Sequence, residues 1–113
     1  MDKREIIAEA FAMLKENNAC RWDPSEKTRE NSGWEKYYSA VYKIRDIINP
    51  DYDYLINYKR IKDKKTETLT LKEVETCLAF MFRGEHFCEG MIYAFIKRGE
   101  LEKLLLRLFS LVE

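Results

Sequence analysis

Apolar side chains recur every three or four positions along most of this 113-residue chain, and that spacing is typical of α-helices. Only four glycines and two prolines interrupt the pattern, which is too few for a loop-rich β fold. No stretch alternates apolar and polar residues convincingly with the period of two that a strand would show. The sequence therefore predicts an all-α fold, a compact bundle of about five helices, with residues 1–113 forming a single domain.

Capping residues mark the ends of several predicted helices. Ser32 with Glu35, and Thr70 with Glu73, each form a Ser/Thr-x-x-Glu capping box at a helix start. The segment 19–33 is polar and reads as a long loop. Residues 50–58 are ambiguous between an extended stretch and one helical turn, and "KRIKDKKTETLT", which begins at residue 59, reads as an exposed loop. The predicted helices span residues 3–17, from the first box to about 49, from the second box to about 83, 86–98, and 100 to the end.

The charges balance at twenty basic and twenty acidic residues, so no general attraction to nucleic acid or to an anionic membrane is expected. No apolar run is long enough to span a membrane. The strongest local charge is "KRIKDKK" (59–65), which is either a solvated loop or a phosphate contact. Its basic residues are Lys59, Arg60, Lys62, Lys64 and Lys65.

The stretch "RGEHFCEG" (83–90) holds the only histidine and one of three cysteines. On a helix His86 and Cys88 diverge by about 200°, and Cys88 shares a face with phenylalanines, which suits neither a thiolate nucleophile nor a Cys–His pair. Zinc sites need clustered Cys and His ligands, which are lacking here. We therefore predict no catalytic residue, no metal and no cofactor. An odd cysteine count behind a polar N-terminus favours a reduced, cytoplasmic protein.

The same stretch reads well as a joint between two helices. Gly84 occupies the position where a left-handed residue would end the third helix. Glu85 and Glu89 would then lie in the first turn of the fourth helix, where the helix dipole favours negative charge, and Arg83 can pair with either. Gly90 is unexplained by this reading, and it would allow close helix packing or leave room for a ligand.

Two further patterns suggest binding. Arg45 lies on the apolar arc of the second helix, so either its stem packs on Tyr42 with the head in water, or it meets an acid or an anionic ligand. Six of the seven tyrosines fall within 37–58, as a half-buried rim or a ring-binding surface. The candidate binding residues are Arg45, Arg83, Glu85, Glu89, Tyr93, Tyr38 and Tyr42.

The last helix carries apolar residues around more than half of its circumference. One packing face does not need so many, so this helix is either central in the bundle or also packs against a second chain. The second reading predicts a homodimer through residues 100–113.

"RGEHFCEGMIYAFIKRGELEKLLLRL" (83–108) resembles the signature segment of a bacterial family known as DUF6508. That segment has an arginine shortly before Phe-Cys-Asp/Glu-Gly, then a helix, a glycine and a leucine-rich helix. "GWEKYYSAVYKI" and "DYDY" resemble the weaker central part of the family, whereas the first thirty residues match nothing recognisable. The resemblance implies a compact domain of bacterial or mobile-element origin with no assigned activity. His86 departs from the more basic or polar residue expected there.

These patterns rank the functions. The first is a protein-interaction or regulatory module without enzymatic activity, which could be a homodimer. The second is a small-ligand binding protein that holds an anion through Arg45, Arg83 and Glu89. The third is nucleic-acid binding through 59–65, which the zero net charge disfavours. Hydrolysis ranks last, because paired carboxylates, a phosphate loop and a nucleophile elbow are all missing.

Overall fold

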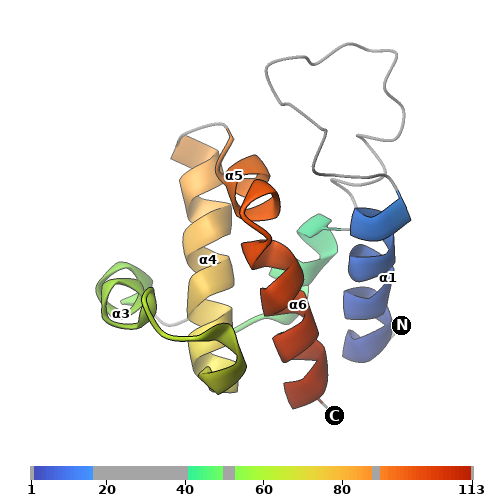
Figure 1. The fold of residues 1–113 in the computed structure, drawn as a ribbon, viewed down its shortest axis with the longest axis horizontal. Coiled ribbons are helices and arrows are strands. Elements are labelled where there is room, and N and C mark those ends of the chain that lie inside the picture. Colours follow the sequence, from blue (N-terminus) through green and yellow to red (C-terminus); the bar gives the residue numbers. More distant parts are fainter. Residues whose placement is uncertain (1, 17–40, 50–52, 88–89, 113) are drawn as a thin grey trace.

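The structure is a computed structural model that describes residues 2–16, 41–49, 53–87 and 90–112. Within these ranges it contains helices and no strand, which confirms the all-α prediction (Figure 1). No helix among them is long and apolar enough to cross a membrane. The elements are α1 (Lys3–Glu16), α3 (Tyr54–Ile61), the 3-10 helix η3 (Thr66–Thr68), α4 (Leu71–Phe87), α5 (Met91–Lys97) and α6 (Glu100–Leu111), and residues 41–47 are also helical.

Helix α6 is the central element of the described fold. It packs against α1 on one side and against α4 and α5 on the other, and it also contacts η3 (Figure 1). Leu101, Leu104, Leu105 and Leu108 are buried along it. This central position accounts for the wide apolar sweep of the helix without a second chain.

The core is built from the inward faces of the helices. Among the described residues, Phe95 of α5 is the largest fully buried side chain, and it lies near Phe80 of α4 with 6.4 Å between ring centroids. Apolar residues spaced by three and four along the first, second and third predicted helices supply much of this core, except Leu71, which was expected to face inward but is 39% exposed. Their buried members include Ile7, Ala10, Val41, Ile44, Val74, Leu78 and Met81.

The capping box at the start of α4 is confirmed. The backbone N–H of Thr70 donates to Oε1 of Glu73 at 2.9 Å, and the N–H of Glu73 donates to Oγ1 of Thr70 at 3.2 Å. Lys64 adds an ion pair with Glu73 at 2.8 Å. The hydrogen bond from Lys64, followed by that from the Thr70 N–H, lowers the pKa of the Glu73 carboxyl. The same glutamate therefore starts α4 and holds the preceding loop.

The predicted helix end at Gly84 is wrong. Helix α4 continues through Gly84 to Phe87, and the left-handed glycine is Gly90, with φ 108°, directly before α5. A Cβ on Gly84 would lie 2.9 Å from side-chain atoms of Met91, so this glycine permits a close approach between α4 and α5. A glycine inside a helix costs only up to ~1 kcal/mol, which such packing can offset. Gly99 is left-handed, with φ 74°, and lies at the predicted break between the helix that ends at 98 and the helix that begins at 100.

The ambiguous segment after residue 50 forms helix α3, which is longer than the single turn considered from the sequence. Tyr58 stacks on Phe80 of α4, with 3.8 Å between ring centroids and 5° between the planes. The expected exposed loop therefore starts later than predicted, after α3, and Ile61 and Leu69 at its two ends are buried.

Two polar contacts between distant parts of the sequence hold segments that have no regular structure. The N–H of Asn49 donates to Oε2 of Glu75, a mostly buried carboxylate of α4, at 2.7 Å. Nε of Arg107 on α6 donates to the carbonyl of Leu69 at 2.8 Å. Each contact supplies a partner to a backbone group that no helix satisfies.

Candidate functional site

A cavity of about 400 Å³ lies between the 41–49 segment and α4. Ala79 and Phe82 are buried and form its apolar floor together with Ile48, which is partly buried. The rim consists of three exposed side chains that can carry positive charge, Arg45, Arg83 and His86. An apolar floor under a cationic rim suits an organic anion better than a neutral ligand.

The structure resolves the two readings of Arg45. Its guanidinium lies 5.1 Å from the ring centroid of Tyr42, and its side chain is 59% exposed. The nearest acid among the described residues is its neighbour Asp46, at 4.0 Å. The guanidinium itself therefore lies over the Tyr42 ring, and more than half of the Arg45 side chain is exposed to water. The exposure argues against a deeply buried anion anchor and places Arg45 at the cavity rim.

Tyr42 contacts two of the residues that line the cavity. It is half-buried, and its ring is tilted against Phe82 with 5.5 Å between the centroids. Because Phe82 forms part of the floor, Tyr42 links the floor to the guanidinium of Arg45 at the rim.

Arg83 and His86 stand one turn apart on α4, so they share a face of the helix. Arg83 makes no ion pair with Glu85, one of the two partners that the sequence suggested, and the other, Glu89, lies outside the described residues. The sequence reading gave His86 no special role. Its spacing of three from Arg83 was the signal that could have placed both at one site.

Glu85 belongs to the helix joint and not to the cavity. Its carboxylate accepts hydrogen bonds from the backbone N–H of Gly90 at 3.0 Å and of Ile92 at 2.9 Å. The sequence analysis placed Glu85 in the first turn of the fourth helix. In the structure Glu85 lies on α4, and its side chain reaches across to the start of α5. A carboxylate at a helix N-terminus satisfies free N–H groups and the helix dipole together.

We expect Glu85→Ala to lower the free energy of unfolding by about 2 kcal/mol, because two charge-assisted hydrogen bonds are lost. Glu85→Gln keeps an acceptor and should lose less. Glu67→Ala, at an exposed glutamate of η3, is the matched control and should change stability by under about 0.5 kcal/mol in urea unfolding. Equal losses in Glu85→Ala and Glu67→Ala would contradict the capping role.

The remaining candidates fall outside this cavity or outside the described residues. Tyr38 and Glu89 lie outside the described residues, as does the side chain of Tyr93. Among the described residues no group of three or more His, Cys, Asp and Glu could hold a metal ion. The basic residues of 59–65 divide between α3, which holds Lys59 and Arg60, and the following loop, which holds Lys62, Lys64 and Lys65.

The family comparison covers almost the whole chain. The model of DUF6508, described as a family of unknown function, matches residues 4–113. The chain belongs to this family. The match extends well beyond the 83–108 segment that carries the resemblance, and it includes the first thirty residues from position 4 on. No curated protein and no solved structure matches this DUF6508 chain. Both Arg45 and the α4 residues of the cavity lie inside the DUF6508 match.

Proposed function

We propose that this protein is a small binding module whose cavity between residues 41–49 and α4 takes an organic anion with an apolar body. The observation that carries the proposal is the convergence of Arg45, Arg83 and His86, from two segments, around the floor made by Ala79 and Phe82. A carboxylate or phosphate would lie between the guanidinium groups, which can donate paired hydrogen bonds. The apolar part of the ligand would cover the floor.

The exposure of the rim predicts the character of the binding. Charges in contact with water are screened by salt, so the affinity should fall as ionic strength rises. The floor contribution should persist at high salt, because apolar burial does not depend on screening. A ligand with both parts is therefore expected to bind better than a simple ion.

The test compares charged and neutral probes of the same shape. Decanoate, 4-phenylbutyrate and phenyl phosphate are titrated by calorimetry. Each is compared with a neutral counterpart, which is the amide for the two carboxylates and phenol for phenyl phosphate. We expect at least one anion to bind and its neutral counterpart to bind at least tenfold more weakly, as for the loss of a charge-assisted hydrogen bond. Arg83→Gln should weaken the anion by a similar factor.

Arg60→Gln is the matched control, because Arg60 is an exposed arginine of α3 outside the cavity. It should bind the anion as the unaltered protein does. Equal weakening by Arg60→Gln, or no preference for the anions over their neutral counterparts, would sink the proposal.

A protein-interaction role, ranked first from the sequence, remains a second proposal. The observation that favours it is an exposed apolar pair on α3, Leu55 at 51% and Ile56 at 56%. For the predicted homodimer through residues 100–113, the large apolar side chain exposed on α6 is Leu106, at 52%. Native mass spectrometry separates these ideas, since it reports a dimer, a retained ligand or a bare monomer in one spectrum.

A further inference from the structure

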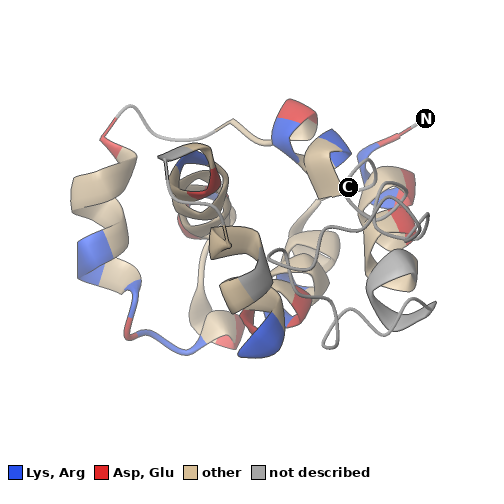
Figure 2. Ribbon diagram, turned by 90° about the horizontal axis from the view of Figure 1, so that it is seen from above, with Lys and Arg blue, Asp and Glu red and all other residues tan. Residues whose placement is uncertain are grey.

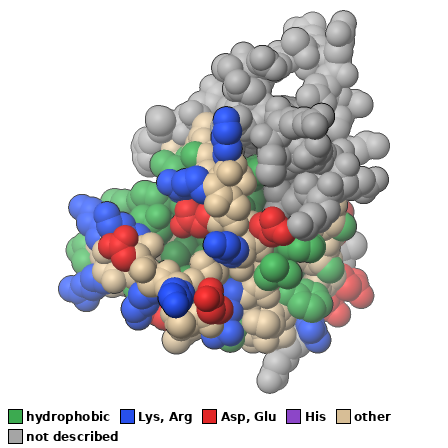
Figure 3. Space-filling view, viewed as in Figure 1, with side chains coloured by type: hydrophobic (Ala, Val, Ile, Leu, Met, Phe, Trp, Pro, Cys, Tyr) green, Lys and Arg blue, Asp and Glu red, His purple; other side chains and the backbone are tan. Residues whose placement is uncertain are grey.

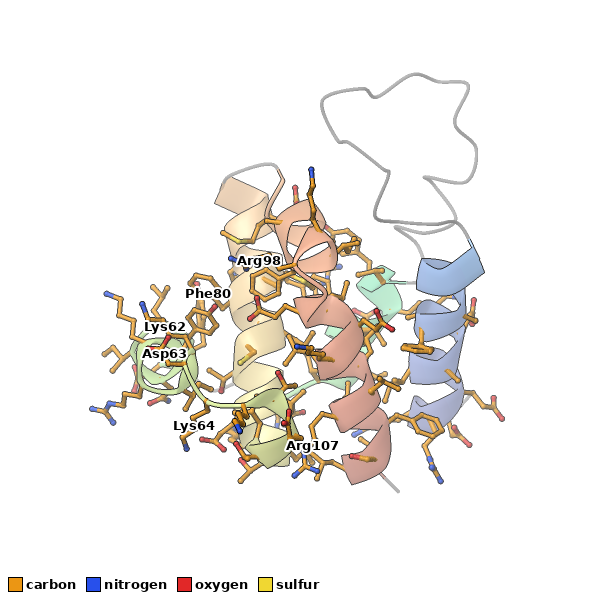
Figure 4. The ribbon with its side chains drawn as sticks, viewed as in Figure 1. Lys62, Asp63, Lys64, Phe80, Arg98 and Arg107 are labelled. Carbon is orange, nitrogen blue, oxygen red and sulfur yellow. The ribbon has the colours of Figure 1, made fainter. Side chains whose placement is uncertain are left out.

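A second pocket, of about 260 Å³, lies between the loop after α3, helix α4 and the start of α6. Among the described residues, four cationic side chains from three parts of the chain line it, against one acid, Glu100. Figure 3 shows Lys and Arg side chains gathered on this face, over α3 and the loop that follows it. Three of the residues concerned, Lys62, Lys64 and Arg98, are labelled in Figure 4. The four cations are Lys62, Lys64, Arg98 and Lys103.

Two of these cations are already paired with carboxylates. Lys64 contacts Glu73 at 2.8 Å and Arg98 contacts Glu100 at 2.9 Å. Lys62 and Lys103 make no ion pair with the described residues. The pocket therefore retains the charge of two lysines, which a divalent anion would neutralise.

The two paired cations make contacts that restrict their side chains, which are each more than half exposed. The guanidinium of Arg98 lies 5.0 Å from the ring centroid of Phe95, a fully buried residue, as well as beside Glu100. Lys64 is tied to Glu73, which itself forms the capping box of α4. Fixed donors lose little side-chain entropy on binding, which favours affinity.

The inner wall of the pocket includes Cys77, whose side chain is buried. Burial, with smaller contributions from Glu100 and Glu73, raises the pKa of this thiol to about 12. The group is therefore a neutral thiol near pH 7 and a poor nucleophile. The chemistry of the pocket points to binding and not to covalent catalysis.

This pocket is separate from the Arg45–Arg83 cavity. Both involve α4, but at about 100° per residue the cavity residues of α4 lie roughly 140–240° around the helix from Cys77. The two sites therefore occupy opposite faces of α4. In Figure 2, blue Lys and Arg positions run from the end of α3, at the left, into the loop that follows it.

We propose that the pocket of Lys62, Lys64, Arg98 and Lys103 binds the phosphate group of a small ligand. A phosphate carries about two negative charges and accepts several hydrogen bonds, which matches the residual charge and the donors from three segments. A nucleic-acid backbone would need an extended basic track, whereas this is a compact recess in a chain of zero net charge. A small ligand and a nucleic acid would both present a phosphate to this pocket, so the experiment compares the two directly.

In the experiment, inorganic pyrophosphate is titrated into the full chain at low salt, and the heat of binding is measured by calorimetry. We expect saturable pyrophosphate binding. In the double variant that carries both Lys62→Gln and Lys103→Gln, the affinity should fall at least fivefold. Lys59→Gln, on exposed α3, is the matched control and should leave binding unchanged. The fivefold loss should persist when both lysine changes are made in an Arg83→Gln background, which removes binding at the proposed organic-anion cavity and so separates the two sites. Thermal melting confirms that the variants fold, since both lysines are exposed.

A mixed-sequence single-stranded oligonucleotide is the second arm. Weaker binding than pyrophosphate per phosphate, with the same sensitivity to Lys62 and Lys103, supports the small-ligand assignment. No saturable pyrophosphate binding would overturn the proposal, and so would equal weakening by Lys59→Gln. Tight oligonucleotide binding that depends on Lys59 and Arg60 would also overturn it, in favour of a nucleic-acid surface.

Discussion

Phe95→Ala is expected to lower the free energy of unfolding by about 4 kcal/mol, near the upper end for a single core truncation. The ring is fully buried in the core beside Phe80 and beneath the guanidinium of Arg98. Its removal forfeits the buried apolar area and leaves a cavity that the surrounding helices fill only in part. For a chain of this length, that loss corresponds to a drop of roughly 15 °C in melting temperature.

Two variants frame this result in urea unfolding and thermal melts. Phe95→Leu retains most of the volume and should cost no more than about 1.5 kcal/mol. Leu106→Ala, at an exposed leucine of α6, should stay within about 0.5 kcal/mol of the unaltered chain. A loss in Phe95→Ala as small as that in Leu106→Ala would show that Phe95 is not a core residue.

The second large effect concerns the thiol of Cys77. A shift of its pKa from 9.0 to about 12 reduces the thiolate fraction at pH 8 by roughly a thousandfold. Burial between α4 and α6 also excludes the reagent. We therefore expect iodoacetamide to modify Cys77 at least a hundredfold more slowly in the folded chain than in guanidinium chloride.

Peptide mapping by mass spectrometry reads Cys77 separately from the other two cysteines. The modification rate of the same peptide in denaturant is the reference, so differences in reagent quality or pH do not affect the ratio of the two rates. Comparable rates in both conditions would mean that α4 and α6 separate often in the native state. That result would also count against the preformed phosphate pocket, because Cys77 forms part of its wall.

The sequence predicted helix positions well where the deciding residues lie within a few positions of one another along the chain. The box of Thr70 and Glu73 placed the start of α4, and apolar spacing placed the buried faces of α1 and α6. Gly84 misled the prediction because the sequence cannot show that a side chain from another helix needs the space. Side-chain atoms of Met91 lie 2.9 Å from where a Cβ of Gly84 would stand, and the left-handed residue is Gly90 instead.

The candidate site was predicted only in part. Arg45 and Arg83 were both selected, but their approach depends on how residues 41–49 pack on α4, which no local pattern reveals. His86 was set aside, yet it shares the rim. Contacts such as Glu75 with Asn49 and Arg107 with Leu69 join residues 26 and 38 positions apart, so they arise from tertiary packing alone.

The order of the elements has a consequence for synthesis on the ribosome. Helix α6 is the piece that α1, α4 and α5 all pack against, and it is made after every one of them. Until residues 100–111 leave the exit tunnel, the apolar faces of the earlier helices lack their common partner. The nascent chain therefore exposes these apolar faces until α6 emerges, and chaperones bind chains in that state. A protein truncated shortly before residue 100 would keep the same faces exposed.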